Sequence, residues 1–241
     1  MNNAQINALP VVMHRSSTHR AFAPRIFARS AAILLMLCMT GCGILPKKEN
    51  IQVIAPHVKV APDASWPGVS WQLAVARPTT SKLLDSSHIV VSPTPETLQV
   101  YHAASWTDSV PELLQSIVAE AFEDSGKITA VARQATAVRA DFLLLLDIRH
   151  FEAVYANPAL NSRAGQSPPN TLIEVSAKLV DSNGHVIAAR TFSQTTAASG
   201  IAVPAVTEAF NIGLSGLTRE LVGWTLNAGQ QAQAATKTPK K

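Results

Sequence analysis

His150 has the most suggestive surroundings among the residues that could do chemistry. It follows a run of apolar residues, and Asp147 and Glu152 lie within three positions of it. A histidine beside carboxylates can bind a metal ion or transfer a proton, so a metal site or an acid/base site is one interpretation. The alternative, which we favour, is that His150 is an ordinary strand residue on the solvent-facing side.

A pair of aspartates in the same segment is the next candidate. Asp141 and Asp147 are six residues apart, and this even separation places both on one face of a strand. Six residues of strand span about 20 Å, which is too far for two carboxylates to act together. The sequence also contains no phosphate-binding loop, no Gly-x-Ser-x-Gly elbow and no His-Glu-x-x-His motif. We therefore predict no catalytic residues, no metal site, no cofactor and no enzymatic activity.

Cysteine chemistry is confined to the beginning of the chain. The two cysteines are Cys38 and Cys42, and no cysteine follows them. This distribution excludes a disulfide scaffold, a cysteine-based zinc site and a cysteine nucleophile in the rest of the protein.

The positive charge also lies outside the body of the chain. The 241 residues include 20 Lys plus Arg and 16 Asp plus Glu, for a net charge of +4. Residues 1–41 contain four arginines and no acid, and residues 229–241 contain three lysines and no acid. A nucleic-acid-binding protein keeps positive charge on its folded part, because phosphate contacts dominate its affinity. We therefore predict no nucleic-acid partner.

Residues 1–41 are predicted to be a signal peptide. Residues 14–30 are basic and free of acids, and residues 31–39 form the apolar run AAILLMLCM. A spanning helix needs about 20 apolar residues, so this run is too short for a stable transmembrane anchor. The basic region is long, and both Met1 and Met13 remain candidates for the true start.

The end of the apolar run resembles the lipobox of bacterial lipoproteins. Met39-Thr40-Gly41-Cys42 has small residues directly before the cysteine, with Met39 where that family usually has Leu. The resemblance implies cleavage before Cys42, lipidation of Cys42 and a stable anchor with several acyl chains, palmitate among them. Gly43 replaces the Asp that is usual for retention in the inner membrane, which implies the periplasmic leaflet of the outer membrane. The alternative is an incidental cysteine beside an ordinary cleavage site.

The remainder divides by composition into three parts. Residues 42–70 contain four prolines and are predicted to be the lipid anchor and an extended tether. Residues 71–228 are predicted to form the folded domain. Residues 229–241 are rich in Ala, Gln, Thr and Lys, which predicts a disordered tail.

Two helices have clear signals. Ser109 and Glu112 form the pattern of a capping box, an apolar stripe follows, and Gly126 is a plausible stop. Apolar residues from about Pro204 to Leu226 lie on one face of a final helix.

Strands are predicted between and before these helices. Residues 181–184, Asp-Ser-Asn-Gly, indicate a hairpin turn. The run 142–146 is typical of a central strand buried on both faces. The order of elements predicts an α/β or α+β domain with one mixed sheet and helices packed on it. The predicted strands are 72–76, 88–92, 97–101, 128–132, 141–155, 171–180 and 185–195.

Aromatic residues are the candidates for recognition. Tyr101 and Trp106 are weak candidates for partner binding, and we favour a core or lid role for Trp106 over the helix start. Trp66 and Trp71 are either exposed contact residues or the beginning of the core, since aromatics are enriched in interfaces. Trp224 is expected to lie in the core.

The pattern Tyr101-x₄-Trp106-x₄-Pro111-x₂-Leu114, followed by an apolar helix, resembles the ABC-type transport auxiliary lipoprotein family, the paraquat-inducible protein C-like group. The resemblance covers roughly residues 70–226. Later segments agree with it in order: Ala140-Asp141-Phe142, Phe151-Glu152-Ala153-Val154, Leu179-Val180-Asp181, Phe192 and Trp224.

This resemblance implies a single α/β domain, with a mixed β-sheet flanked by helices in three layers and a long C-terminal helix. It implies a lipoprotein that works with an ABC permease, its ATPase and a mammalian-cell-entry-type substrate-binding protein to move lipids between the inner and outer membranes. The resemblance supplies no catalytic residues. The identity of the lipid, any contact of this subunit with it, and homo-oligomer formation are left open.

Two alternatives remain. The first is a structural or assembly lipoprotein of the outer membrane that takes no part in transport. The second is an enzyme on a lipoprotein tether, for which His150 or Asp147 would be the starting point.

Overall fold

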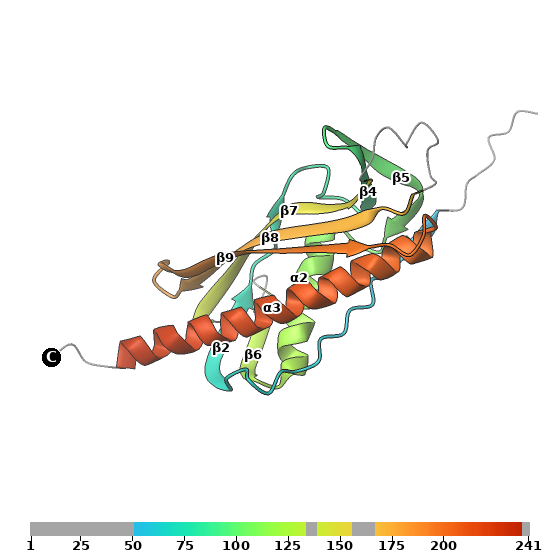
Figure 1. Ribbon diagram of the computed structural model, residues 1–241. Helices are drawn as coiled ribbons and strands as arrows, with labels where there is room; N and C mark the ends of the chain where they lie inside the picture. Colours follow the sequence, from blue (N-terminus) through green and yellow to red (C-terminus); the bar gives the residue numbers. More distant parts are fainter. Residues whose placement is uncertain (1–50, 134–138, 156–166, 238–241) are drawn as a thin grey trace, which may run out of the picture. The chain divides into compact units, whose positions relative to one another are not determined.

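The computed structural model describes residues 51–133, 139–155 and 167–237, which belong to one compact unit (Figure 1). The predicted signal peptide and Cys42 lie outside the described residues. No helix in the described ranges combines the length and the apolar character that a membrane crossing requires.

The sheet is built around β7 (Phe142–Val154). One edge of β7 pairs along its whole length with the antiparallel strand β8 (Asn170–Asp181). β8 continues through a turn into β9 (Val186–Ala197), which pairs with it in the antiparallel sense. In this turn Gly184 has φ 85° and its N–H donates to Asp181 O at 3.0 Å, which confirms the hairpin predicted at 181–184.

The other edge of β7 pairs with three parallel strands in succession. These are β2 (Val69–Val75), the short β3 (Thr79–Thr80) and β4 (His88–Thr94). β2 pairs with the beginning of β7, β3 with its middle and β4 with its end. β7 therefore connects the part of the sheet around β2 with the part around β4.

Three further strands complete the sheet. β6 (Ile128–Arg133) pairs with β2, β5 (Thr97–Trp106) pairs with β4, and β1 (Gln52–Ile54) pairs with β5. Within the described residues the sheet has nine strands of mixed direction.

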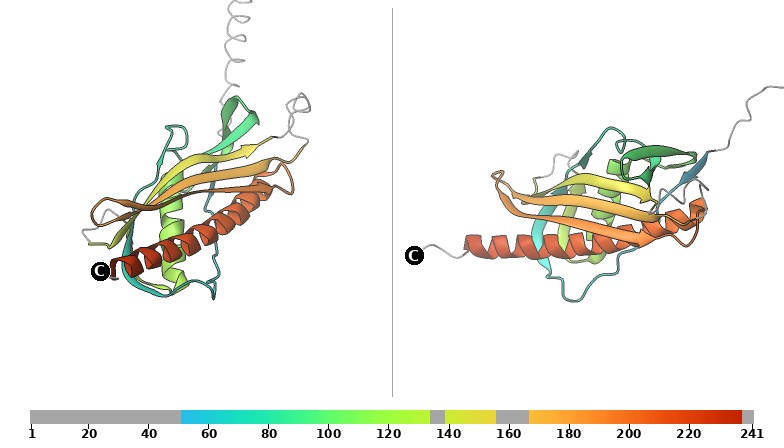
Figure 2. Two further views of the ribbon diagram at one scale, coloured as in Figure 1. Left: turned by 60° about the vertical axis from the view of Figure 1, so that its left-hand side comes forward. Right: turned by 45° about the horizontal axis from the view of Figure 1, so that its top comes forward.

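The two described helices cover one face of this sheet (Figure 2). Along β7 the even-numbered residues from Phe142 to Ile148 are buried, whereas Leu145 is 37% exposed on the opposite face. The run 142–146 is therefore buried on one face, not on both as predicted, because the described helices pack on that face only. The α/β class, the mixed sheet and the long C-terminal helix are confirmed. Of the three layers expected, the described residues supply the sheet and one helix layer.

Helix α2 (Val110–Ser125) begins and ends where its capping residues predict. Ser109 is the N-cap, and Gly126 ends the helix in the left-handed conformation with φ 60°. The capping box forms differently from the prediction. The Ser109 hydroxyl donates to Glu112 Oε2 at 3.0 Å and makes no hydrogen bond to the helix backbone.

Helix α3 (Val203–Lys237) is longer than predicted. Leu226 is buried, and Gly229 lies directly against the ring of Trp71, where an added Cβ would be 2.5 Å from Trp71 Cζ2. The prediction of a disordered tail from residue 229 is therefore wrong as far as Lys237. The physical reason is that the Ala- and Gln-rich segment has a high helix propensity and continues a helix already packed on the core.

The chain before β2 is part of the folded body from β1 onward. Beyond β1, the His57 N–H donates to Asn211 Oδ1 at 3.0 Å, and Arg219 Nη2 donates to Asp63 Oδ2 at 2.6 Å. Trp66 is 7% exposed and lies against Gly223 of α3. The prediction that residues 42–70 form an extended tether outside the folded domain is therefore wrong for residues 51–70, because the contacts of His57, Asp63 and Trp66 hold this segment on α3.

Three of the four tryptophans are core residues, whereas Trp224 is half-buried and packs against the core. Trp66, Trp71 and Trp106 are all buried, which confirms the core interpretation over exposed contact residues. Trp71 packs edge-on against Phe142 near the beginning of β7, and Trp106 packs edge-on against Phe151 near its end. The core thus has an aromatic cluster toward each end of the sheet.

Candidate functional site

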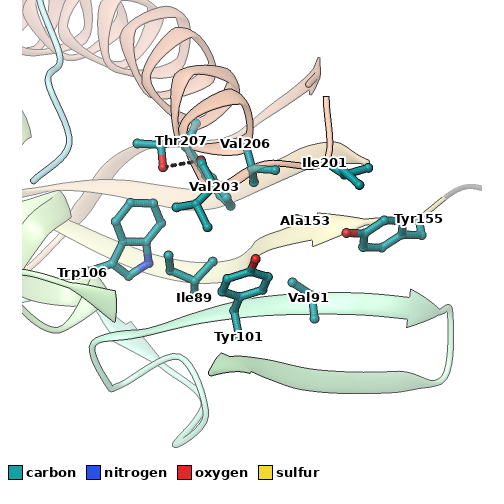
Figure 3. Close-up of a pocket in the computed structure, with 11 residues that line it drawn as sticks. Ile89, Val91, Tyr101, Trp106, Ala153, Tyr155, Ile201, Val203, Val206 and Thr207 are labelled. Atoms are coloured by element: carbon teal, nitrogen blue, oxygen red, sulfur yellow. Dashed lines mark hydrogen bonds between the residues drawn. The ribbon is translucent and has the colours of Figure 1, made fainter. Parts of the chain in front are cut away.

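An apolar pocket opens where β4, β5, the end of β7 and the beginning of α3 meet (Figure 3). Its floor is Trp106, which is the last residue of β5 and is only 2% exposed. The pocket is lined by Ile89, Val91, Tyr101, Trp106, Ala153, Tyr155, Ile201, Val203, Val206, Thr207 and Phe210.

Backbone pairing and ring packing fix the floor of the pocket. The Trp106 N–H donates to Ser87 O at 2.8 Å, which holds the end of β5 beside β4. The indole ring then packs edge-on against Phe151 of β7 and Phe210 of α3, with ring centroids 5.9 and 5.3 Å away. Because three elements hold the indole ring, its orientation is set by the fold.

The rim of the pocket carries two tyrosines. Tyr101 comes from β5, and Tyr155 follows β7, where its N–H donates to Ser92 O at 3.0 Å. In Figure 3 both hydroxyl groups point toward the space between the other lining residues. Burial raises the pKa of Tyr155, and the nearby Tyr101 raises it further, so the Tyr155 hydroxyl remains a donor at neutral pH.

The pocket is small and without charge. Its volume is about 20 Å³, and no Asp, Glu, Lys, Arg or His lines it. The Thr207 hydroxyl is already used, since it donates to Val203 O at 2.9 Å. The indole Nε1 of Trp106 is buried and has no hydrogen-bond partner within the described ranges. The arrangement suits a neutral group that accepts one hydrogen bond in apolar surroundings.

The structure brings together the two recognition candidates. Tyr101 and Trp106 both line the pocket, although Trp106 is part of the core as well. Sequence reasoning missed Tyr155 and Ile201, which come from other parts of the chain. The only local signal for Tyr155 is its position at the end of a strand. The only local signal for Ile201 is its position just before a helix. A role for Tyr101 and Trp106 in partner binding stays a prediction.

His150 contacts one of the two carboxylates near it in the sequence. Its Nδ1 lies 2.7 Å from Glu152 Oε1, while the other oxygen of Glu152 accepts from the Phe151 N–H at 2.8 Å. The side chain of His150 is 47% exposed, as expected for a strand residue on the solvent-facing side. No group of three His, Cys, Asp or Glu side chains able to hold a metal ion occurs in the described part of the chain.

The two aspartates have separate structural partners. Asp141 Oδ2 accepts from the Gln72 N–H at 2.8 Å, and Asp147 Oδ1 accepts from the Thr79 hydroxyl at 3.0 Å. The hydrogen bond to Gln72 joins the beginning of β7 to β2, and the one to Thr79 joins the middle of β7 to β3. The side chain of His150 is hydrogen-bonded to Glu152, and not to Asp141 or Asp147.

The family of the chain follows from its match to a family model. The model for the ABC-type transport auxiliary lipoprotein component matches residues 52–222. The chain belongs to this family. The match begins at β1, in agreement with the structure, and ends within α3. The family is one of lipoproteins that are auxiliary components of ABC-type transport.

Two solved structures are similar to this chain. The crystal structure of protein XCC0632 from Xanthomonas campestris is 46% identical in sequence, with a TM-score of 0.69 over 76% of this chain and 99% of that chain. A crystal structure of an uncharacterised protein has the same fold, with a TM-score of 0.55 and 11% identity over 72% of this chain and 97% of that chain.

A longer relative is also similar in sequence. The uncharacterised protein bll6063 of Bradyrhizobium diazoefficiens is 28% identical over 190 residues, which make up 79% of this chain and 48% of that protein. The chain therefore spans about half the length of this curated relative.

Proposed function

We propose that the protein is a lipoprotein of the outer membrane, anchored through Cys42 and facing the periplasm. In this proposal it serves, without catalysis, as the auxiliary component of an ABC transport system. The system uses a mammalian-cell-entry-type substrate-binding protein, and it moves lipids between the inner and outer membranes.

The family match over residues 52–222 is the observation that carries the proposal. The sequence Met39-Thr40-Gly41-Cys42, which precedes that match, supports the lipid anchor. A chain anchored by several acyl groups remains on its membrane, because each buried CH₂ contributes about 0.8 kcal/mol. The residues from Gly43 to Asn50 then separate the lipid from the first described residue, Ile51.

The first test concerns the anchor. We expect the wild-type protein in the outer-membrane fraction and the Cys42→Ser variant in the soluble fraction, because the serine oxygen does not take the place of the lipidated sulfur. Cys38→Ser is the matched control and should leave the protein on the membrane. Fractionation followed by mass spectrometry of the N-terminal peptide measures both. Retention of the Cys42→Ser variant on the membrane would contradict the anchor.

The same cells test the partners. After mild cross-linking, purification of the wild-type protein should recover a permease, an ATPase and a cell-entry-type protein. Recovery with other outer-membrane proteins but none of these three would contradict the transport role. That result would favour a structural or assembly lipoprotein instead.

A further inference from the structure

The indole N–H of Trp106 is a hydrogen-bond donor held in place without an acceptor. Its nitrogen is buried and has no partner within the described ranges, and Figure 3 shows it on the side of the ring next to Ile89, another residue that lines the pocket. A buried donor without a partner is destabilising, so such groups are usually bound to water or a ligand. Phe151 and Phe210 hold the ring from two sides, and the indole is therefore not free to turn toward another acceptor.

The size of the pocket limits what can reach this donor. A volume of about 20 Å³ admits one group the size of a water molecule or a carbonyl oxygen. A carboxylate or phosphate is disfavoured, since no cationic side chain lines the pocket and burial of an unpaired charge is costly. A neutral carbonyl oxygen can accept the hydrogen bond without this cost.

The rim can hold the apolar remainder of such a ligand. Ile201 is 47% exposed, and Val91 and Val203 contribute further apolar surface to the pocket (Figure 3). The hydroxyls of Tyr101 and Tyr155 face the space between the lining residues and can donate to a second oxygen. An ester linked to an aliphatic chain has this combination of one carbonyl oxygen, one further oxygen and an apolar chain.

We propose that this pocket binds the acyl ester group of a lipid, whose carbonyl oxygen accepts a hydrogen bond from Trp106 Nε1 while the acyl chain lies on the apolar rim around Ile201. The inference deepens the proposed function, which leaves open any contact of this subunit with lipid. It rests on that function only for the choice of a lipid as the source of the ester.

Nuclear magnetic resonance of the indole groups tests the proposal directly. The chain has four tryptophans, Trp66, Trp71, Trp106 and Trp224, so four indole N–H signals are expected and Trp→Phe variants assign them. The sample is the chain from residue 42 with Cys42→Ser, titrated with ethyl hexanoate. We expect a saturable downfield shift of the Trp106 signal, because its proton gains an acceptor. The Trp71 signal should stay in place.

Three other probes separate the possible ligands. Sodium hexanoate and hexane should bind roughly tenfold more weakly than the ester, since one carries a charge and the other has no acceptor. Dihexanoyl phosphatidylcholine, kept below its micelle concentration, should reproduce the shift caused by ethyl hexanoate. A shift caused by ethyl hexanoate but not by dihexanoyl phosphatidylcholine would contradict a lipid as the source of the ester group.

Variants with matched controls locate the site. Trp106→Phe should weaken ester binding roughly tenfold, as followed by the Tyr101 backbone amide, whereas Trp71→Phe removes an equally buried indole far from the pocket and should leave binding unchanged. Because a core variant can lose its fold, a surface pair is included. Ile201→Ser should weaken binding, and Ile212→Ser, an exposed isoleucine that does not line the pocket, should not.

The outcomes that overturn the proposal are distinct from a failure of the transport role. A Trp106 signal that no ester concentration shifts means that water alone fills the pocket. An equal response to hexane means that the indole N–H takes no part. Both measurements use the chain without its covalent lipid anchor and without partner proteins. A wrong anchor or a wrong transport system therefore leaves their result unaffected.

Discussion

At the scale of single residues, Asp63 shows how a surface carboxylate holds an extended segment. Its two oxygens accept from the Ser65 backbone N–H at 2.9 Å and from Arg219 of α3 at 2.6 Å. The hydrogen bond from the Ser65 backbone, followed by that from Arg219, holds the pKa of Asp63 well below its ordinary value. This carboxylate therefore favours the folded state while it is ionised.

The pH dependence of stability follows from the direction of this shift. Above the ordinary pKa of an aspartate, about 4, the carboxyl is ionised in both states and its stabilisation is fully present. As the pH falls below that value, the unfolded chain binds a proton before the folded chain does, and the stabilisation is lost. Asp63→Asn should therefore lower the Tm at pH 7 but make progressively less difference below pH of about 4.

A double-mutant comparison separates the ion pair from other effects. In the Arg219→Gln background, Asp63→Asn should lower the Tm at pH 7 by less than in the wild type, because one of its partners is already gone. Thermal unfolding followed by circular dichroism measures all four chains. An equal loss of Tm in both backgrounds would show that Arg219 does not act through Asp63.

Residues also show how much of the site the sequence could predict. Tyr101 and Trp106 are close in sequence, and both line the pocket. Tyr155 and Ile201 join them only because β7 lies beside β4 and because α3 begins at the same end of the sheet. A contact of this kind leaves no periodic pattern in the sequence, so local reasoning finds Tyr101 and Trp106 but misses Tyr155 and Ile201.

At the scale of elements, α3 contains glycines with opposite roles. An added Cβ at Gly223 would be 2.5 Å from Trp66 Nε1, whereas at Gly216 it would be 3.5 Å from the nearest atom, in the side chain of Gln194. The first glycine allows a close approach of the extended segment to the helix, and the second has room for a side chain.

Alanine substitutions should therefore change the stability in opposite directions. Gly223→Ala is expected to lower the free energy of unfolding by about 1–3 kcal/mol, because the indole of Trp66 must move. Gly216→Ala should raise it by roughly 0.5–1 kcal/mol, since alanine has a higher helix propensity and fits without displacing Gln194. Urea denaturation measures both. A loss of stability at both positions would refute the different roles.

Elements with strong local signals are the ones that the sequence predicts. Helix α2 begins after Ser109 and ends at Gly126, and the β8–β9 hairpin turns at Gly184, because caps and turns depend on a few neighbouring residues. The segment 51–70 and the last turns of α3 were mispredicted. Proline content and a low-complexity sequence are local signals, whereas Trp66 and Trp71 hold these segments through contacts with Gly223 and Gly229, far away in the chain.

At the scale of the whole molecule, the extended segment 51–68 is part of what keeps the body folded. It contributes β1 to the sheet and buries Trp66 against α3. Removal of a buried large aromatic side chain alone typically costs about 3–5 kcal/mol. We therefore expect the segment to stabilise the folded domain as well as to lie on it.

A pair of truncated chains tests this statement. A chain that begins at residue 71, the boundary suggested by composition, should be at least about 3 kcal/mol less stable than a chain that begins at residue 51. Equilibrium unfolding in urea, followed by tryptophan fluorescence and circular dichroism together, gives both values. Equal stabilities would mean that the segment lies on the surface without stabilising it.

The position of β7 in the sheet has a consequence for the order in which the chain folds. β2, β3 and β4 all pair with β7, yet they precede it by roughly sixty to seventy residues in the register of the sheet. Because a chain is synthesised from its N-terminus, β2, β3 and β4 are made before β7. They remain without this main partner until more than half of the protein has been synthesised. Contacts of such long sequence separation make folding slow. Until β7 is available, the apolar strands that pair with it stay exposed. A newly made chain is therefore expected to bind a holding chaperone.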